Sequence, residues 1–179
     1  EYTIIPLTQV SGSIATEALV TNTGNVDVTN AVVTSTVYDG VGNIVHTETS
    51  APVATIAVAA SESVALTGYT PTAVDAYVVE YTVAIDESDA EAGNDFASIL
   101  IEIDEVTYAR DDSQVSAFLG NPGGFVGGNI YDLVNPDAIE SVSVFHGNQN
   151  VGDTMELIVH AVDVASGLPG ALLGTSGLY

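Results

Sequence analysis

The chain has 179 residues and is 46% hydrophobic, which is enough to bury the core of one large β domain or of two small ones. It carries one Lys or Arg against 24 Asp and Glu, a formal net charge of −23, so nucleic acid and anionic lipid are poor partners. No apolar run approaches the roughly 18 residues that insert across a membrane, and the absence of Cys excludes disulfides and thiolate metal sites. We interpret the acidic coat as suited to salty, halophilic or marine surroundings, with bound cations as the alternative.

The first half of the chain alternates β-branched or aromatic residues with small or polar ones and is broken by Gly-Asn turns. The centre of this pattern, residues 14–45, predicts the middle of an antiparallel sheet, and Pro6 predicts an edge or sheet-switching strand. The strands that we predict are residues 2–10, 14–21, 32–38, 44–49, a weaker strand after Pro52, 63–67, 77–85 and 97–103. Their number and turn spacing favour an all-β, two-sheet sandwich of immunoglobulin type.

Several stretches carry a family resemblance: "ALVTNTGNVDVTNAVVTSTVYDGVGNIV", "VALTGYTPT", and "AYVVEYTVAID" followed by "AGNDFAS". They resemble the bacterial cell-adhesion-related (CARDB-like) immunoglobulin-like modules, over about residues 1–105. The resemblance implies an immunoglobulin-like sandwich from a large secreted or surface protein. We therefore place a first domain at residues 1–106 and a linker at residues 107–113.

The second half, residues 114–179, differs because glycine becomes dense, as in "GNPGGFVGGN". The strands that we predict here are residues 114–119, 129–134, 139–146, 155–163 and 171–175. The stretch "IYDLVNPDAIESVSVFHGNQNVGDTMELIVHAVDVASGLPGALLGTS" resembles the opening half of jelly-roll-like domains in proteins that Gram-negative bacteria export by the type IX pathway. A jelly roll needs about eight strands, so we expect an incomplete domain whose missing strands come from a longer parent protein or a neighbouring subunit.

Two acidic clusters are candidate calcium sites, because calcium takes several oxygen ligands from carboxylates and turn carbonyls. The first precedes the last strand of the first domain and contains Asp86, Glu87, Asp89, Glu91, Asn94 and Asp95. The second lies at the joint of the domains and contains Asp104, Glu105, Asp111 and Asp112. Neither follows the Asp-x-Asp-x-Asp-Gly loop, so a solvated acidic loop is the alternative for each. We expect Arg110, the only permanent cation, to anchor carboxylates of the second cluster, or alternatively to contact an anion.

No pattern in the sequence predicts an enzyme. His46, His146 and His160 lie on separate predicted strands without metal-ligand spacing. The "GTSG" around Ser176 lacks the Gly-x-Ser-x-Gly spacing of a hydrolase nucleophile. The glycine-rich stretch has neither the Lys nor the following helix of a phosphate-binding loop. With 24 acids, close carboxylate pairs arise by chance and do not indicate a glycosidase.

The chain opens at Glu1 without an initiator Met or a signal peptide, and we expect a mature or excised segment. Our leading hypothesis is a non-enzymatic extracellular or cell-surface module pair of a bacterial protein, acting as an adhesin, spacer or assembly segment beside other domains or subunits. One alternative is a carbohydrate-binding or accessory part of a larger secreted hydrolase, with Tyr108, Phe125 and Tyr131 as candidate aromatics. The other alternative is a subunit of an extracellular filament.

Overall fold

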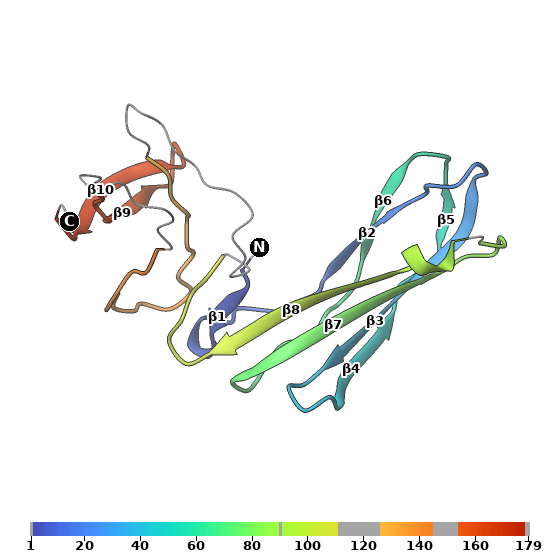
Figure 1. Ribbon diagram of the computed structural model, residues 1–179, viewed down its shortest axis with the longest axis horizontal. Helices are drawn as coiled ribbons and strands as arrows, with labels where there is room; N and C mark the ends of the chain where they lie inside the picture. The colour runs from blue at the N-terminus through green and yellow to red at the C-terminus, as the bar shows by residue number, and fades with distance from the viewer. Residues whose placement is uncertain (1, 90, 111–125, 145–153, 178–179) are drawn as a thin grey trace. The chain divides into compact units, whose positions relative to one another are not determined.

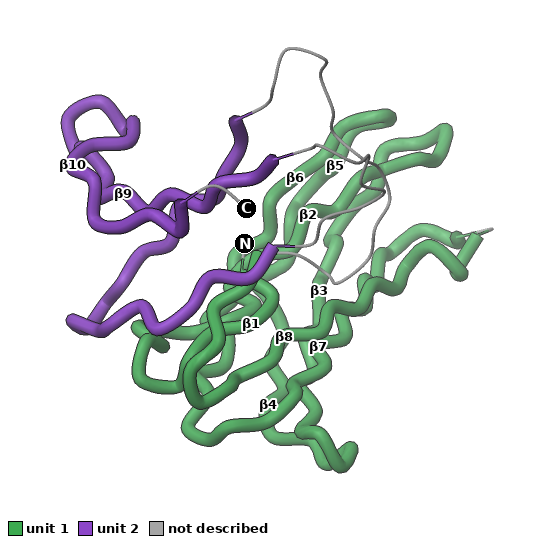
Figure 2. Tube along the Cα trace, turned by 60° about the vertical axis from the view of Figure 1, so that its left-hand side comes forward, with its two compact units in different colours: residues 1–113 green, residues 114–179 purple. Residues whose placement is uncertain are grey.

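The computed structural model describes residues 2–89, 91–110, 126–144 and 154–177 (Figure 1). The chain forms two compact units, unit 1 over residues 1–113 and unit 2 over residues 114–179 (Figure 2). Within the described residues the regular structure is β-strand, apart from two 3₁₀ turns at Leu7–Gln9 and Ala92–Asn94. The predicted all-β fold is therefore confirmed.

Unit 1 is built on a six-stranded sheet in the order β1-β8-β7-β3-β4, with β5 also paired to β3. Its strands are β1 (Ile4–Pro6), β3 (Val28–Tyr38), β4 (Ile44–Thr49), β5 (Val53–Ile56), β7 (Asp75–Ala84) and β8 (Phe96–Asp104). All neighbours are antiparallel except β1 and β8, which run parallel. The first residues of β3 pair with β5 and the residues from Thr34 onward pair with β4, so one long strand holds two partners in succession.

The core of unit 1 comes from alternate residues of the long strands, because successive side chains of a strand point to opposite faces. On β3, Val33, Ser35 and Val37 are at most 1% exposed, and the residues that separate them are half-buried. The buried cluster consists of Ala15, Val37, Tyr77, Val79, Ile101 and Ile103. The period-two pattern of the sequence is thus the alternation between a core face and a solvent face.

A second sheet contains two strands, β2 (Glu17–Thr21) and β6 (Ser61–Ala65), and packs on the first in a sandwich-like arrangement (Figure 1). Val64 of β6 is buried, and Ala18 and Val20 of β2 are half-buried, so its inner face is apolar. The pairing of β2 with β6 corrects the prediction that residues 14–45 form the centre of one antiparallel sheet. β3 is central, but β2 belongs to the opposite sheet because it pairs with β6, a strand far along the chain.

The first predicted strand, residues 2–10, is shorter in the structure. β1 ends at Pro6, and a 3₁₀ turn follows. Proline has no backbone N–H to donate to a ladder, so it is tolerated at an edge and ends the pairing there. β1 lies at the edge of the large sheet, which confirms the edge position predicted from Pro6.

In unit 2 the described strands are β9 (Ile158–Asp163) and β10 (Leu168–Thr175), which form an antiparallel pair. The carbonyl of Asp163 closes their turn by accepting the N–H of Gly167 at 2.7 Å. No residue that the structure describes in unit 2 is buried, so its described part has no core of its own.

Two strand predictions for unit 2 are wrong, because residues 129–134 and 139–144 form no strand. Alternating residues become a strand only beside a partner that completes the hydrogen bonds, and no described segment supplies one here. The strand predicted at residues 114–119 and the end of the one at 139–146 lie outside the described residues. Among the described residues no helix is long and apolar enough to cross a membrane.

Candidate functional site

The first acidic cluster lies in the connection from β7 to β8, where two acids bind the beginning of β3. The Glu87 carboxylate accepts hydrogen bonds from the amide and the hydroxyl of Thr29, at 2.8 and 2.6 Å. These bonds hold the pKa of Glu87 below its ordinary value. Asp86 accepts a hydrogen bond from the side chain of Asn30, whose φ is positive at 51°. These two acids therefore fasten the acidic loop to the large sheet.

Asp89 and Asp95 are the two predicted calcium ligands that the loop brings together. Burial raises the pKa of Asp95, and the charge of Asp89 and a hydrogen bond between the two side chains raise it further. Asp89 also accepts the backbone N–H of Glu91 at 2.7 Å, which closes the turn. Two ionised carboxylates this close repel each other, and a shared proton or a bound cation would relieve the repulsion.

The described residues hold no group of three or more His, Cys, Asp and Glu side chains that could bind a metal ion. In the second cluster, Asp104 accepts the backbone N–H of Glu105 at 2.7 Å. Hydrogen bonds from the Thr107 side chain and from this amide hold the pKa of Asp104 below its ordinary value. Asp111 and Asp112 lie outside the described residues. Calcium binding at either cluster therefore stays a prediction.

Arg110 makes an aromatic contact that the sequence did not predict. Its guanidinium carbon lies 4.2 Å from the centre of the Tyr2 ring, which is a cation–π contact. Tyr2 also packs against Tyr108, with ring centres 5.2 Å apart, and both rings are half-buried. Tyr108, one of the aromatic residues predicted as a candidate for carbohydrate binding, is therefore partly covered by Tyr2. Tyr131 is 39% exposed, and Phe125 lies outside the described residues.

Sequence reasoning missed a polar cluster on β4, around Glu48. Its carboxylate accepts hydrogen bonds from the amides of Thr67 and Gly68, at 3.0 and 2.6 Å, and from the Thr67 hydroxyl. Burial raises the pKa of Glu48, but these bonds and His46, whose Nε2 lies 3.7 Å away, outweigh it and the pKa is lowered. The only signal in the sequence was the His-x-Glu spacing, which puts both side chains on one strand face.

The remaining histidines fall elsewhere. In unit 2 the Nδ1 atom of His160 lies 3.0 Å from the carbonyl oxygen of Gly170, across the β9–β10 pair. His146 lies outside the described residues.

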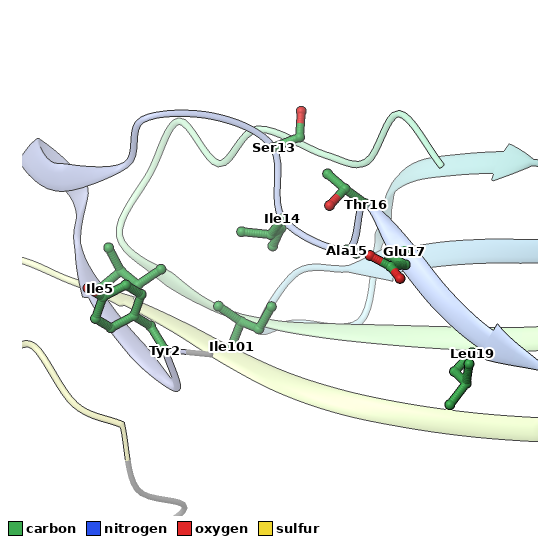
Figure 3. Close-up of a pocket in the computed structure, with 9 residues that line it drawn as sticks. All are labelled: Tyr2, Ile5, Ser13, Ile14, Ala15, Thr16, Glu17, Leu19 and Ile101. Atoms are coloured by element: carbon green, nitrogen blue, oxygen red, sulfur yellow. The ribbon is translucent and has the colours of Figure 1, made fainter. Parts of the chain in front are cut away.

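An open groove of about 520 Å³ lies in unit 1 between β2 and β8 (Figure 3). Its apolar lining comes from Ile5, Ile14, Ala15, Leu19 and Ile101. Figure 3 shows Ile101 pointing from β8 toward Ile14, and Leu19 below β2 on the side of β8. Leu19 is 71% exposed, so the groove leaves a large apolar side chain in water. Nothing in the sequence marked this groove, because it depends on which strands end each sheet.

The backbone of β8 beside this groove is partly unpaired. On the side of β1, Glu102 donates its N–H to the carbonyl of Thr3 at 2.9 Å. On the side of β7, the carbonyl of Asp95 accepts the N–H of Val83 at 3.0 Å. Backbone groups alternate between the two sides of a strand, so those of Phe96, Ser98 and Leu100 point away from β7. Among the described residues, β1 covers this edge only from Glu102 to Asp104.

Comparison of the chain with protein-family models, with curated proteins and with solved structures finds no match.

Proposed function

We propose that the chain is a non-enzymatic module pair of a secreted or cell-surface protein, in which unit 1 acts as a spacer under tension. The observation that supports this role is the pairing of the first strand of unit 1 with its last. β1 and β8 run parallel, with Ile4 opposite Glu102 and Pro6 opposite Asp104. The Ala109 amide also donates to the carbonyl of Ile4 at 3.0 Å.

Parallel strands at the two ends of a module resist extension. A pull on the chain before β1 and after β8 slides the two strands along each other, so their hydrogen bonds must break together. The antiparallel bridge between Ile4 and Ala109 is loaded differently, since its bonds open one after another from the chain ends. We therefore expect a small early extension followed by one cooperative unfolding step of unit 1, whose force reflects the unfolding barrier.

The acidic surface supports the same role. At a net charge of −23, neighbouring copies or modules repel one another at distances up to about the Debye length, roughly 8–10 Å in physiological salt. Such repulsion keeps a series of modules extended and separate.

Single-molecule stretching of the full chain between handles at its two ends tests the proposal. We expect one resolved unfolding step for unit 1, preceded by the small extension from the Ala109 bridge. Unfolding of unit 1 in many small steps at the background force would contradict a spacer role.

Two variants separate the terminal strands from general stability. Glu102→Pro removes the N–H that bonds Thr3 and leaves the pairing with β7 in place, because this N–H points away from β7. Val79→Ala removes packing from the buried cluster and leaves β1 in place. We expect Glu102→Pro to lower the unfolding force more, and the melting temperature less, than Val79→Ala does. The opposite order would contradict the role given to β1 and β8.

A further inference from the structure

We propose that the groove between β2 and β8 binds an extended, cationic peptide strand of another protein, which pairs with the free edge of β8 and lengthens the large sheet. The proposal rests on the non-enzymatic role above, since it gives that role a ligand, but it uses a different part of unit 1. The spacer argument concerns residues 102–104 of β8, where β1 is bound, whereas the peptide would pair with residues 96–100.

The edge of β8 carries backbone groups that point away from β7. Three residues, Phe96, Ser98 and Leu100, direct both N–H and C=O away from β7. A row of such groups is a template for another strand, and proteins that avoid strand addition usually place charges or Pro along the edge. Here the row carries Phe, Ser and Leu, and both Phe96 and Leu100 are more than half exposed. Within the part of the chain that the structure describes, these three edge residues therefore lack the usual protection.

The groove reaches β8 at Ile101, the residue that follows Leu100 of this edge. When a peptide adds to a sheet, its backbone supplies the hydrogen bonds and its alternate side chains enter pockets. Side chains of the added strand on the core side would meet Ile101, Ile14 and the exposed Leu19 (Figure 3). Side chains on the other side would lie beside Phe96 and Leu100. Apolar residues at alternate positions of the peptide would thus cover side chains that now face water.

The carboxylates around the groove and the edge favour a cationic partner. Glu17 lies in the lining of the groove, Glu102 is exposed at the end of the free edge, and Asp95 precedes Phe96. A second copy of this chain would bring another net charge of −23 to the same place, so self-pairing is opposed by repulsion. A peptide with Lys or Arg between its apolar residues complements these carboxylates and arrives faster through electrostatic steering.

The probe for the test is a capped peptide that alternates Val with Lys and Thr, titrated into the full chain at physiological salt. Two matched peptides serve as controls: one has Glu in place of each Lys, and one keeps every charge but has Pro at its centre, so that it cannot form a continuous ladder. Affinity is measured by calorimetry. Binding by the Lys peptide alone supports the proposal. No binding by it, or equal binding by the Pro peptide, overturns it, because charge alone would then explain any attraction.

A protein variant locates the site. Ser98→Pro removes an outward N–H without removing a bond to β7, whereas Ser98→Ala keeps that N–H and changes only the side chain. We expect Ser98→Pro to weaken the Lys peptide about tenfold or more and Ser98→Ala to leave its affinity unchanged. Leu19→Ser, which removes an exposed apolar side chain from the groove without adding a charge and leaves the edge intact, keeps the test valid if Ser98→Pro does not fold, and it should also weaken the peptide's apolar contacts. Unchanged affinity in Ser98→Pro, or in the groove variant at Leu19 if Ser98→Pro does not fold, would overturn the proposal. The stretching result for β1 and β8 would stand or fall separately.

Discussion

At the scale of single residues, the acids of this chain have distinct roles although the composition makes them look alike. Glu87 and Glu48 accept backbone and hydroxyl hydrogen bonds that favour their charged form, whereas Asp95 faces another carboxylate that disfavours it. Acidic side chains therefore stabilise the fold at Glu48 and Glu87 and oppose it at Asp95. Only the partners distinguish them.

Glu48→Gln should destabilise unit 1 by about 1–2 kcal/mol at neutral pH, because the Thr67 and Gly68 amides lose a charged acceptor. The pKa of Glu48 is lower in the folded chain than its ordinary value of 4.5. Its contribution is therefore complete above that value and is lost as the pH falls through it and below. Thermal unfolding at a series of pH values should show the difference between wild type and variant shrinking in acid. The exposed Glu62→Gln, with the same change of charge, serves as control, and an equal effect in both would refute the assignment.

Asp95→Asn should stabilise the chain in the absence of divalent cations, by about 0.5–1 kcal/mol, because it removes the repulsion from Asp89. The pKa of Asp95 is raised in the folded chain, so the gain is largest at neutral pH and disappears as the pH falls. If calcium binds the pair as predicted, millimolar calcium raises the melting temperature of the wild type and not of Asp95→Asn, and EDTA reverses it. Equal calcium shifts in both proteins would speak against a site at these residues.

At the scale of strands and turns, the sequence pattern predicted those strand bounds that depend on nearby residues. β4 has its predicted bounds, since Asp39 accepts hydrogen bonds from the amides of Val41 and Asn43, at 3.1 and 2.7 Å, and turns the chain at a fixed place. The strand predicted over residues 77–85 is β7 within one or two residues, because its alternation is long and regular.

What the sequence could not predict depends on partners far along the chain. The sheet to which β2 belongs follows from its pairing with β6, and residues 129–134 alternate as a strand does without becoming one. The candidate calcium site at residues 86–95 also depends on partners far along the chain. The acids of residues 86–95 were identified from their composition, but the partners of Asp86 and Glu87 lie on β3, more than 50 residues earlier. The groove was missed because it arises where two sheets end.

Gly68 illustrates an element-scale constraint, because it holds the segment after β6 against the segment before β2. It has a positive φ of 74°, and a Cβ atom there would lie 2.3 Å from the carbonyl oxygen of Ile14. Gly68→Ala should therefore cost about 2–3 kcal/mol, measured by denaturant unfolding. Gly42 also has a positive φ, of 87°, but has open space around it, so Gly42→Ala should cost only about 1 kcal/mol. Equal costs would show that the close approach to Ile14 does not matter.

At the scale of the whole molecule, the net charge of −23 affects folding stability, the spacing between modules and the choice of partner. Repulsion among so many carboxylates opposes the compact state, and salt screens it, since the Debye length falls from about 30 Å at 0.01 M to about 3 Å at 1 M ionic strength. The melting temperature should therefore rise steadily with sodium chloride over this range. A melting temperature that is independent of salt, or that falls, would argue that the acidic coat is already neutralised by bound cations.

Among the residues that the structure describes, unit 1 is a two-sheet sandwich in which β8 pairs with β7 on one side and, before Glu102, with no strand on the other. Hydrogen exchange of the backbone amides of β8, followed by NMR in the free chain, tests it most directly. We expect slow exchange at the amides of Ala97, Ile99 and Ile101, which face β7, and fast exchange at those of Ser98 and Leu100. Exchange should be slow again at Glu102, whose amide donates to the carbonyl of Thr3. Uniform protection along β8, or uniformly fast exchange, would contradict this pairing of β8.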